Sequence, residues 1–386
     1  MPGVSFSDNG GMTSASHSSA AAEPFEGLRI RGVAKTFGAD TTVLNEIDLD
    51  VHPGELISLV GSSGTGKSTL LRIIAGLEEP SAGRVTYAGQ PLERGSVGVV
   101  FQRPILYPHL SVKDNILFPT RLGAFAGRVD MDYYRELLEA LKLEGLESRK
   151  PSQLSGGQAQ RVGIARALIR RAPVVLFDEP LASVDEEMSA SIRADIVRLH
   201  ERYGFTGLYV THDQNEALML GQRVAVMDAG YLVQVDTPER LLAHPHTLQV
   251  AKLMAAPALN LLALEDSEAL PAGCELAIRA TALHPVAADA AHSLPVQVLG
   301  HRHLVGGMLY RARLLEAVSL PLEPQQASAG AELSDRVYAR VCAGQELEFF
   351  IPDAQSGSSL NVGDRVHLGV AAERCFVFSN GKRFYL

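Results

Sequence analysis

Residues 61–69 constrain the fold of this chain more than any other segment. They read GSSGTGKST and match the pattern G-x-x-x-x-G-K-[ST], with Gly61, Gly66, Lys67 and Ser68 at its fixed positions. The apolar run before them is ELISLVG, and the helical run that continues from Lys67 is KSTLLRIIAGL. This order of strand, loop and helix predicts an α/β domain with a phosphate-binding loop at the end of a buried strand.

The chemistry of this loop follows from its backbone. Glycines let the chain turn tightly, so that successive N–H groups and the N-terminus of the following helix face phosphate oxygens. Lys67 is expected against the β and γ phosphates, and the Ser68 hydroxyl is expected to ligate magnesium. A glycine-rich turn that only connects two elements is the alternative, but motif and context agree on a nucleotide. The expected phosphate-binding residues are Gly61, Ser62, Ser63, Gly64, Thr65, Gly66, Lys67, Ser68 and Thr69.

A second apolar run, VVLFDEP, places Asp178 and Glu179 at the end of a strand. In α/β sheets the loops around a bound nucleotide gather at this strand end. Asp178 is expected to orient magnesium, and Glu179 is expected to be the general base that polarises the attacking water. An acidic pair after a strand is often only a helix cap, and the phosphate loop makes that alternative the weaker one.

Residues 154–158 read LSGGQ and form a second glycine-rich anion site. Ser155 is placed to cap a helix, while Gly156 and Gly157 allow backbone N–H groups to approach a ligand closely. One chain cannot bring both glycine-rich loops to one γ phosphate if they lie on different lobes. Two chains arranged head to tail can do so, and the pattern therefore predicts a dimer.

Together these motifs resemble the nucleotide-binding subunit of ATP-binding-cassette (ABC) transporters, over residues 28 to about 242. The resemblance implies that Phe37 stacks on adenine, that Gln102 senses magnesium and the γ phosphate, and that Asp185 crosses the dimer interface. It also implies that His212 is the switch histidine. The family more often has Ser, Ala and Leu before the aspartate, where this chain has Ala182, Ser183 and Val184.

The resemblance implies an ATPase that uses ATP and Mg2+ and forms no covalent intermediate. Its catalytic residues are then Glu179, His212 and Gln102, and its metal-binding residues are Ser68, Gln102 and Asp178. A second copy of the chain closes each site. The residues implied to do so are Ser155, Gly156, Gly157, Gln158 and Asp185.

Near Asn260 the sequence changes to Val-rich and Leu-rich runs separated by Gly, Pro and acidic turns, which predicts a separate all-β domain. Pro257, Asn260 and the pair Ile278 and Arg279 resemble carbohydrate-uptake importers, whose cassettes carry a regulatory OB-like (TOBE) domain. This implies import of sugars or polyol phosphates. Polyamine, iron and sulfate or molybdate importers share parts of the pattern and stay open, as does a purely structural barrel that stabilises the dimer.

The expected fold class is therefore a P-loop ABC cassette, a mixed sheet with a helical subdomain, followed by an all-β OB-like domain. We expect a disordered tail over 1–25, the cassette over 26–245 and the β domain over 246–386. Within the cassette, the helical signature subdomain is expected over about 103–170. Residues 128–170 are expected to be helical because Tyr134, Leu137, Leu138 and Leu141 would share one face.

Composition excludes several classes. With 35 Lys and Arg against 44 Asp and Glu, the net charge of −9 has the wrong sign for a protein that coats nucleic acid. The longest apolar run, residues 253–264, is too short to span a membrane, and residues 1–27 have no signal-peptide pattern. Cys274, Cys342 and Cys375 have no metal-ligand spacing.

We therefore expect a peripheral protein on the cytoplasmic face of the inner or plasma membrane. The family implies two integral-membrane permeases and, indirectly, a solute-binding protein as partners, and no nucleic acid. Three other classes fit less well. A soluble ABC ATPase needs a coiled-coil insertion or a second cassette, a P-loop kinase or GTPase lacks LSGGQ, and an exporter usually carries fused membrane helices.

Overall fold

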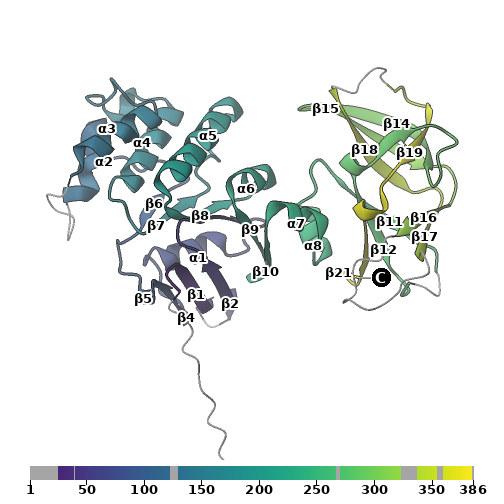
Figure 1. The fold of residues 1–386 in the computed structure, drawn as a ribbon, viewed down its shortest axis with the longest axis horizontal. Coiled ribbons are helices and arrows are strands. Elements are labelled where there is room, and N and C mark those ends of the chain that lie inside the picture. The colour runs from purple at the N-terminus through teal and green to yellow at the C-terminus, as the bar shows by residue number, and fades with distance from the viewer. Residues whose placement is uncertain are drawn as a thin grey trace, which may run out of the picture.

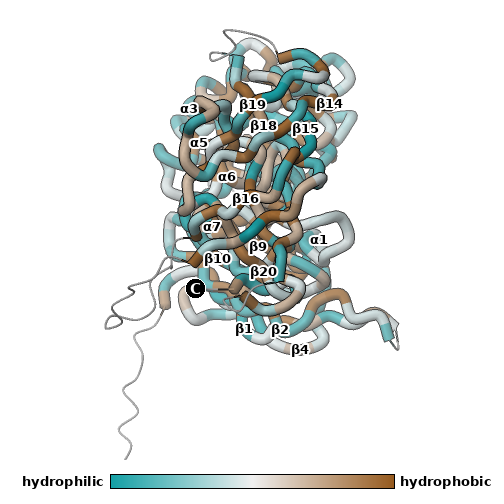
Figure 2. The backbone as a smooth tube through the Cα atoms, turned by 90° about the vertical axis from the view of Figure 1, so that its right-hand side faces the viewer, coloured by the Kyte–Doolittle hydropathy of each residue, from teal (hydrophilic) through white to brown (hydrophobic). Residues whose placement is uncertain are grey.

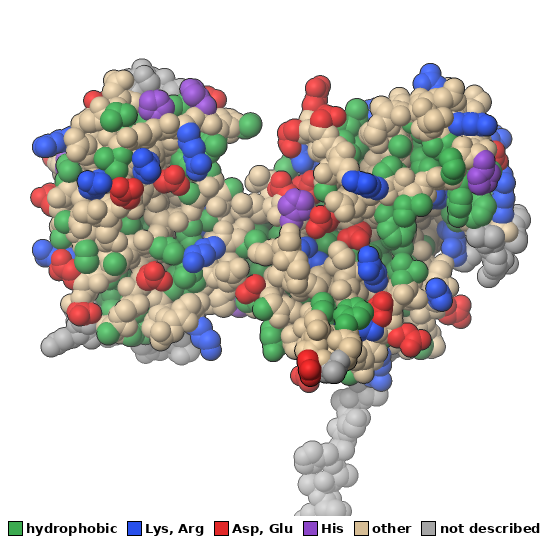
Figure 3. Space-filling view, turned by 180° about the vertical axis from the view of Figure 1, so that it is seen from behind, with side chains coloured by type: hydrophobic (Ala, Val, Ile, Leu, Met, Phe, Trp, Pro, Cys, Tyr) green, Lys and Arg blue, Asp and Glu red, His purple; other side chains and the backbone are tan. Residues whose placement is uncertain are grey.

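The computed structural model shows two bodies, an α/β part and a β-rich part, joined through a narrow waist (Figures 1 and 3). The predicted disordered tail, residues 1–25, lies outside the described residues except for Phe25. The structure describes residues 25–38, 40–121, 129–266, 270–322, 337–353 and 360–384.

A six-stranded sheet in the order β10-β9-β3-β8-β7-β6 forms the centre of the α/β part. Its strands run parallel except β10, which pairs antiparallel with β9. Along β7, Val174 and Leu176 point to one face and Val175 and Phe177 to the other, so both faces are buried. The strands are β3 (Leu56–Val60), β6 (Gly98–Val100), β7 (Val174–Asp178), β8 (Thr206–Thr211), β9 (Arg223–Asp228) and β10 (Tyr231–Asp236).

One face of this sheet packs with α1 (Lys67–Ile74) and an antiparallel sheet in the order β2-β1-β4-β5. The strands of that second sheet are β1 (Leu28–Phe37), β2 (Thr41–Val51), β4 (Ala82–Tyr87) and β5 (Gln90–Pro91). Buried residues of α1, of the central sheet and of β1 and β2 in the second sheet form one core cluster. The phosphate loop therefore lies between two well-packed sheets.

Helices cover the opposite face of the central sheet, and Figure 1 shows them as a lobe around α2 to α5. The prediction of helix across 128–170 is correct for α3 and α4 and wrong between them. Lys142 and Gly145 have positive φ values of 54° and 75°, and a short 3-10 turn begins at Pro151, so the chain cannot continue as an α-helix. Tyr134, Leu137 and Leu138 of the predicted face are buried on α3, and Leu141 is buried directly after the helix ends. The helices are α2 (Val112–Leu117), α3 (Met131–Ala140), α4 (Gly156–Leu168), α5 (Glu186–Tyr203) and α6 (Gln214–Leu220).

The β-rich part confirms the predicted all-β character of the later chain. It contains sheets in the orders β11-β12-β20-β21, β13-β19-β14-β15-β18 and β16-β17, with a core of their own. Figure 2 shows hydrophobic and hydrophilic segments side by side around β15 and β18. More and less buried residues alternate over 311–314 of β15 and over 346–349 of β18, as expected for strands with one buried face. The strands are β11 (Leu259–Ala263), β12 (Glu275–Arg279), β13 (His284–Val286), β14 (Leu294–Leu304), β15 (Gly307–Leu314), β16 (Val318–Leu322), β17 (Val337–Val341), β18 (Glu346–Pro352), β19 (Arg365–Gly369), β20 (Cys375–Ser379) and β21 (Lys382–Arg383).

Two short helices, α7 (Pro238–Ala243) and α8 (Leu248–Leu253), connect the two parts. Val250 of α8 packs with the cassette strands β3 and β9, whereas Ala251 packs against Phe376 and Phe378 of the β-rich part. Helix α8 thus contributes to both cores, and the division at residue 246 stays a prediction. Within the described residues, no helix has the length and apolar character needed to cross a membrane.

Candidate functional site

The loop between β3 and α1 has the geometry of a phosphate cradle. Gly64 and Gly66 have φ values of +82° and +97°, which side chains disfavour, and a Cβ on Gly66 would lie 2.8 Å from the Val43 carbonyl oxygen. The loop encloses a pocket of about 260 Å3. The residues that line it are Val43, Ser63, Gly64, Gly66, Lys67, Ser68, Thr69 and Glu179.

Lys67 lies at the base of this pocket and is buried. Its Nζ donates to the carbonyl oxygens of Gly61, at 2.8 Å, and Ser62, at 2.9 Å. Burial lowers the pKa of the ammonium group, while the carboxylates of Glu179 and Asp178 act to raise it. The side chain is therefore held within the loop by groups that phosphate oxygens can replace.

Ser68 and Asp178 meet where α1 begins and β7 ends. The Ser68 hydroxyl donates to Asp178 Oδ1 at 3.2 Å. Burial raises the pKa of the Asp178 carboxyl, and the hydrogen bond from Ser68 opposes that rise. A hydroxyl and a carboxylate beside a phosphate loop are hard oxygen donors, so this pair fits a magnesium ion.

Glu179 and His212 form the second contact at this edge of the sheet. His212 Nδ1 lies 3.1 Å from Glu179 Oε2. Glu179 has a φ of +43°, uncommon for a residue with a side chain, and its N–H donates to the Val210 carbonyl at 3.0 Å. The strained backbone and the β8 contact together aim the carboxylate at the pocket that it lines.

Gln102 follows β6, which is the neighbour of β7 in the sheet. Val100 of β6 pairs with Phe177 of β7, so Gln102 and Glu179 both lie two residues beyond this pair at the same sheet edge. The Gln102 side chain is exposed. Gln160 of α4 donates to the Phe101 carbonyl at 3.2 Å and so ties this loop to the signature helix.

Phe37 ends β1, and 43% of its surface is exposed. Lys35 Nζ lies 4.8 Å from the centre of its ring. The exposure excludes a core role for this aromatic ring, one face of which is covered by the Lys35 ammonium. Its strand pairs with β2, which contributes Val43 to the phosphate pocket.

The LSGGQ segment starts α4 with a capping box. Ser155 Oγ accepts from the Gln158 N–H at 3.2 Å, and Gln158 Oε1 accepts from the Ser155 N–H at 3.0 Å. Gly156 is exposed with open space around its Cα, whereas a Cβ on Gly157 would lie 2.5 Å from Met188 Cγ. A side chain at position 157 would therefore require the Met188 side chain to move.

Asp185 caps α5, its Oδ1 accepting from the Met188 N–H at 2.9 Å. Neither Asp185 nor the residues of LSGGQ line the phosphate pocket. Apart from Phe37 and Gln102, the structure therefore separates the predicted site residues into two groups. Lys67, Ser68, Asp178, Glu179 and His212 are linked to one another or to the pocket, and the signature loop and Asp185 form a second, surface-facing group.

Two buried networks behind these groups were not predicted from the sequence. In the first, Asp195 of α5, with a fully buried side chain, accepts from Arg161 of α4 at 3.0 Å, and Arg161 also donates to Ser191. Arg198 and Lys142 also contact the Asp195 carboxylate. The run AQRVGIARAL indicates a helix, but nothing in it indicates that Arg161 is buried against Asp195.

The second network lies behind His212. Glu216 Oε2 accepts from the Thr211 hydroxyl at 2.7 Å and from the Tyr209 hydroxyl at 3.1 Å, and its other oxygen lies 3.5 Å from Arg193. Thr211 directly precedes His212, so these contacts fix the strand end that carries the histidine. Only the fold brings β8, α5 and α6 together here.

Comparison with known proteins decides the family. The family model of the ABC transporter matches residues 44–182. An sn-glycerol-3-phosphate import ATP-binding protein UgpC of Yersinia enterocolitica is 45% identical over 243 residues, or 61% of this chain and 67% of the relative. The chain belongs to the ABC transporter family of ATP-binding proteins. The predicted family resemblance is confirmed.

Three further similarities fit this assignment. The UgpC protein of Salmonella typhi is 42% identical over 266 residues, 66% of this chain and 74% of the relative. For a UgpC of Rhizobium johnstonii, 45% identical, the match spans 65% of the relative. The structure of cbiO1 from Clostridium perfringens, described as part of the ABC transporter complex cbiONQ, aligns with a TM-score of 0.51 and 27% identity over 57% of this chain and 92% of that one. The predicted cassette fold is therefore confirmed.

Proposed function

We propose that this chain is the ATP-hydrolysing subunit that energises solute import through a membrane ABC transporter. The observation that carries the proposal is one connected arrangement at one sheet edge. Lys67 lies inside the loop, and Ser68 is hydrogen-bonded to Asp178. Glu179 is hydrogen-bonded to His212 and lines the same pocket. These are the parts that phosphoryl transfer to water needs.

Each side chain has a definite task in this proposal. The loop N–H groups and Lys67 stabilise the charge that develops on the transferred phosphoryl group. Ser68, Asp178 and Gln102 would hold Mg2+, which, when bound, offsets the charge on the β and γ phosphates. Glu179 accepts the proton of the attacking water, and His212 fixes the Glu179 carboxylate and reaches the γ phosphate.

The second group of residues serves the other copy of the chain. Ser155 and Gly156 are exposed at the N-terminus of α4, where N–H groups and the helix dipole favour an anion. In a head-to-tail dimer these residues, with Gln158 and Asp185, close the phosphate pocket of the partner. ATP thus stabilises the closed dimer, and hydrolysis releases it.

The relatives support a proposal for the solute and for the membrane partners. Their printed names describe sn-glycerol-3-phosphate import, which supports a polyol phosphate or a related sugar as the solute here. We place the cassette at 26–245 and an OB-like regulatory domain at 246–386. The partners are two permeases and, through them, a solute-binding protein, which puts this peripheral subunit on the cytoplasmic face of the membrane.

The loop after Gln102 is the expected docking surface for a permease. Ile105 and Tyr107 are exposed large hydrophobic side chains, and the Tyr107 ring packs against Phe118. Asn115 holds the loop by accepting from the Tyr107 N–H and donating to its carbonyl. An exposed apolar surface on a fixed loop beside Gln102 can transmit the state of the nucleotide site to a partner.

Substitution Glu179→Gln tests the ATPase. An amide can hold water but cannot accept its proton, so turnover should fall by about 100-fold or more while ATP binding stays close to wild type. Arg302→Ala, in the β-rich part, serves as a control that leaves turnover unchanged. Hydrolysis by Glu179→Gln at the wild-type rate removes Glu179 from the proposed role. ATP-driven uptake of glycerol 3-phosphate in vesicles with the permeases tests the solute, and its absence with intact ATPase rejects that solute alone.

A further inference from the structure

Three arginines gather where the β-rich part meets the cassette, and we call them the arginine cluster. Arg279 ends β12, Arg374 lies in the 3-10 turn η6 (Ala372–Arg374), and Arg383 lies in β21. The guanidinium groups of Arg279 and Arg383 lie 5.1 and 4.5 Å from the centre of the buried Phe376 ring. Three positive charges therefore share one small region of the junction.

Part of this charge has a structural task. Arg279 Nη1 donates to the Leu242 carbonyl at 2.8 Å, and Arg383 Nη1 donates to the Ala243 carbonyl at 3.2 Å. These carbonyls belong to the last turn of α7, where the helix dipole favours cations. The two side chains thus join the β-rich part to the end of a cassette helix.

This task uses only one of the three nitrogens of the Arg279 guanidinium. Its Nε and Nη2 are buried and have no hydrogen-bond partner within the part of the chain that the structure describes. Burial, together with the charges of Arg383 and Arg374, lowers the pKa of Arg279 to about 10, so the group stays charged at neutral pH. Buried charges in proteins are normally paired, which makes these two donors unusual.

We propose that the arginine cluster, Arg279 with Arg374 and Arg383, is a binding site for a tetrahedral oxyanion of the phosphate or sulfate class. A guanidinium presents its N–H groups as a fork that matches two oxygens of such an anion. Arg374 is exposed and gives the anion a way in from the surface. The two unpartnered donors of Arg279 then become its innermost ligands after a small shift of the side chains that cover them.

Binding at this place has a mechanical consequence. The anion would neutralise the mutual repulsion of three cations, two of which, Arg279 and Arg383, already hold the last carbonyls of α7. It would thereby strengthen the contact between the cassette and the β-rich part. The inference is independent of the proposed ATPase function, because no residue of the phosphate pocket takes part.

Thermal melting of the full-length chain tests the site. Inorganic phosphate, sulfate and glycerol 3-phosphate, each at 10 mM, are compared with chloride at equal ionic strength. The phosphate loop also binds such anions, so every melt is repeated in Lys67→Ala. We expect each oxyanion to raise the melting temperature of Lys67→Ala by about 2 °C or more, as for a ligand in excess over its Kd. A response to glycerol 3-phosphate but not to inorganic phosphate or sulfate would identify a phosphate monoester as the ligand.

The decisive variants add Arg374→Ala or Arg302→Ala to Lys67→Ala. Arg374 is exposed and its removal should not impair folding, whereas Arg302 is an exposed arginine of β14 paired with Glu348 and far from the cluster in sequence. The oxyanion shift should disappear with Arg374→Ala and persist with Arg302→Ala. Equal shifts in both variants would show a general salt effect and overturn the proposal, as would the absence of any shift in Lys67→Ala.

Discussion

Replacement of Asp195 by alanine should destabilise the cassette more than most single substitutions. The Asp195 side chain has no exposed surface, and that of its partner Arg161 is 8% exposed. Arg161 donates to this carboxylate through Nε at 3.0 Å, and its Nη2 lies 2.8 Å away. Removing one partner of a buried pair leaves the other charge without compensation, which typically costs about 3–5 kcal/mol.

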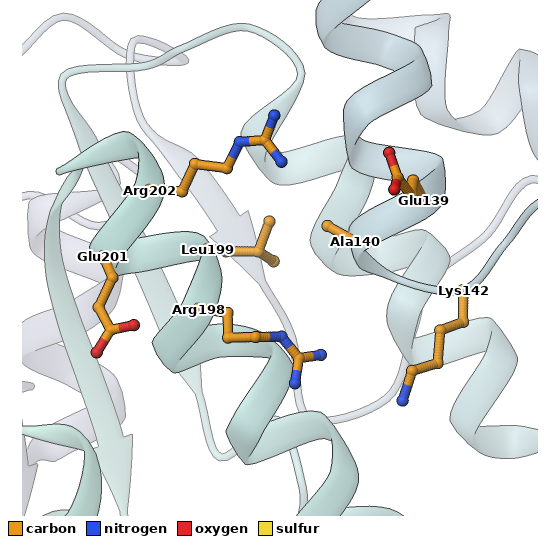
Figure 4. A pocket seen from close by; sticks show the side chains of 7 residues that line it. All are labelled: Glu139, Ala140, Lys142, Arg198, Leu199, Glu201 and Arg202. Carbon is orange, nitrogen blue, oxygen red and sulfur yellow. The ribbon is translucent and has the colours of Figure 1, made fainter.

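Lys142→Ala provides the matched control for this prediction. Its ammonium lies 3.9 Å from the same carboxylate, at the limit of an ion pair, and the side chain is 59% exposed. Figure 4 shows Lys142 and Arg198 projecting into the open pocket between α3 and α5, a space of about 530 Å3. Because the Lys142 ammonium is largely solvated and lies at the limit of ion-pair distance, its contribution should be about 1 kcal/mol or less.

Urea denaturation followed by far-ultraviolet circular dichroism measures the difference. The chain has no tryptophan, so the backbone signal is the better probe. In Asp195→Ala the unfolding transition of the cassette should move to lower urea concentration. In a thermal melt the same loss of stability corresponds to a fall in the melting temperature of the cassette of about 6–20 °C. The reasoning is refuted if the free energies of unfolding of Asp195→Ala and Lys142→Ala differ by less than 1 kcal/mol while both depend on urea concentration with the same slope.

Three further predictions follow from the site and its surroundings. Phe37→Ala should weaken ATP affinity more than it lowers turnover at saturating ATP, and equal affinity in a binding titration would exclude adenine stacking there. Gly157→Ala should destabilise the fold because its Cβ would contact Met188, whereas Gly156→Ala should melt like wild type, and equal melting temperatures would contradict this. Burial raises the pKa of Tyr134 to about 12, so the folded chain keeps a proton that the unfolded chain loses near pH 10. Wild type should therefore lose stability relative to Tyr134→Phe as the pH rises from 10 towards 12, and its urea midpoint should fall further below that of Tyr134→Phe over that interval, because the buried Tyr134 hydroxyl has no hydrogen-bond partner among the described residues.

The sequence was sufficient for the strands and loops that carry the nucleotide chemistry. The predicted strand before Gly61, the helix from Lys67 and the strand ending at Asp178 all lie where expected. The sequence patterns that predict these elements are local, because an apolar run, a glycine-rich turn and a helix start each occupy only a few consecutive residues.

Contacts between distant segments could not be predicted in this way. Nothing near Asp195 indicates that Arg161, 34 residues earlier, supplies its counter-charge. Likewise, the Glu179 backbone conformation depends on a hydrogen bond to β8, and Arg279 meets α7 only because the two parts of the chain dock there. Periodicity also failed between α3 and α4, where turns at Lys142 and Gly145 interrupt an otherwise helical composition.

The central claim, that ATP closes a head-to-tail dimer, is tested most directly by the mass of Glu179→Gln in solution. Light scattering after size exclusion should give the 41.4 kDa monomer in ADP and twice that mass in saturating ATP and Mg2+. Adding Gly156→Asp, which places a carboxylate on the exposed signature loop, should keep the chain monomeric in ATP although it still binds the nucleotide. A Glu179→Gln chain that binds ATP and remains a monomer, or a dimer that Gly156→Asp leaves intact, would contradict the account.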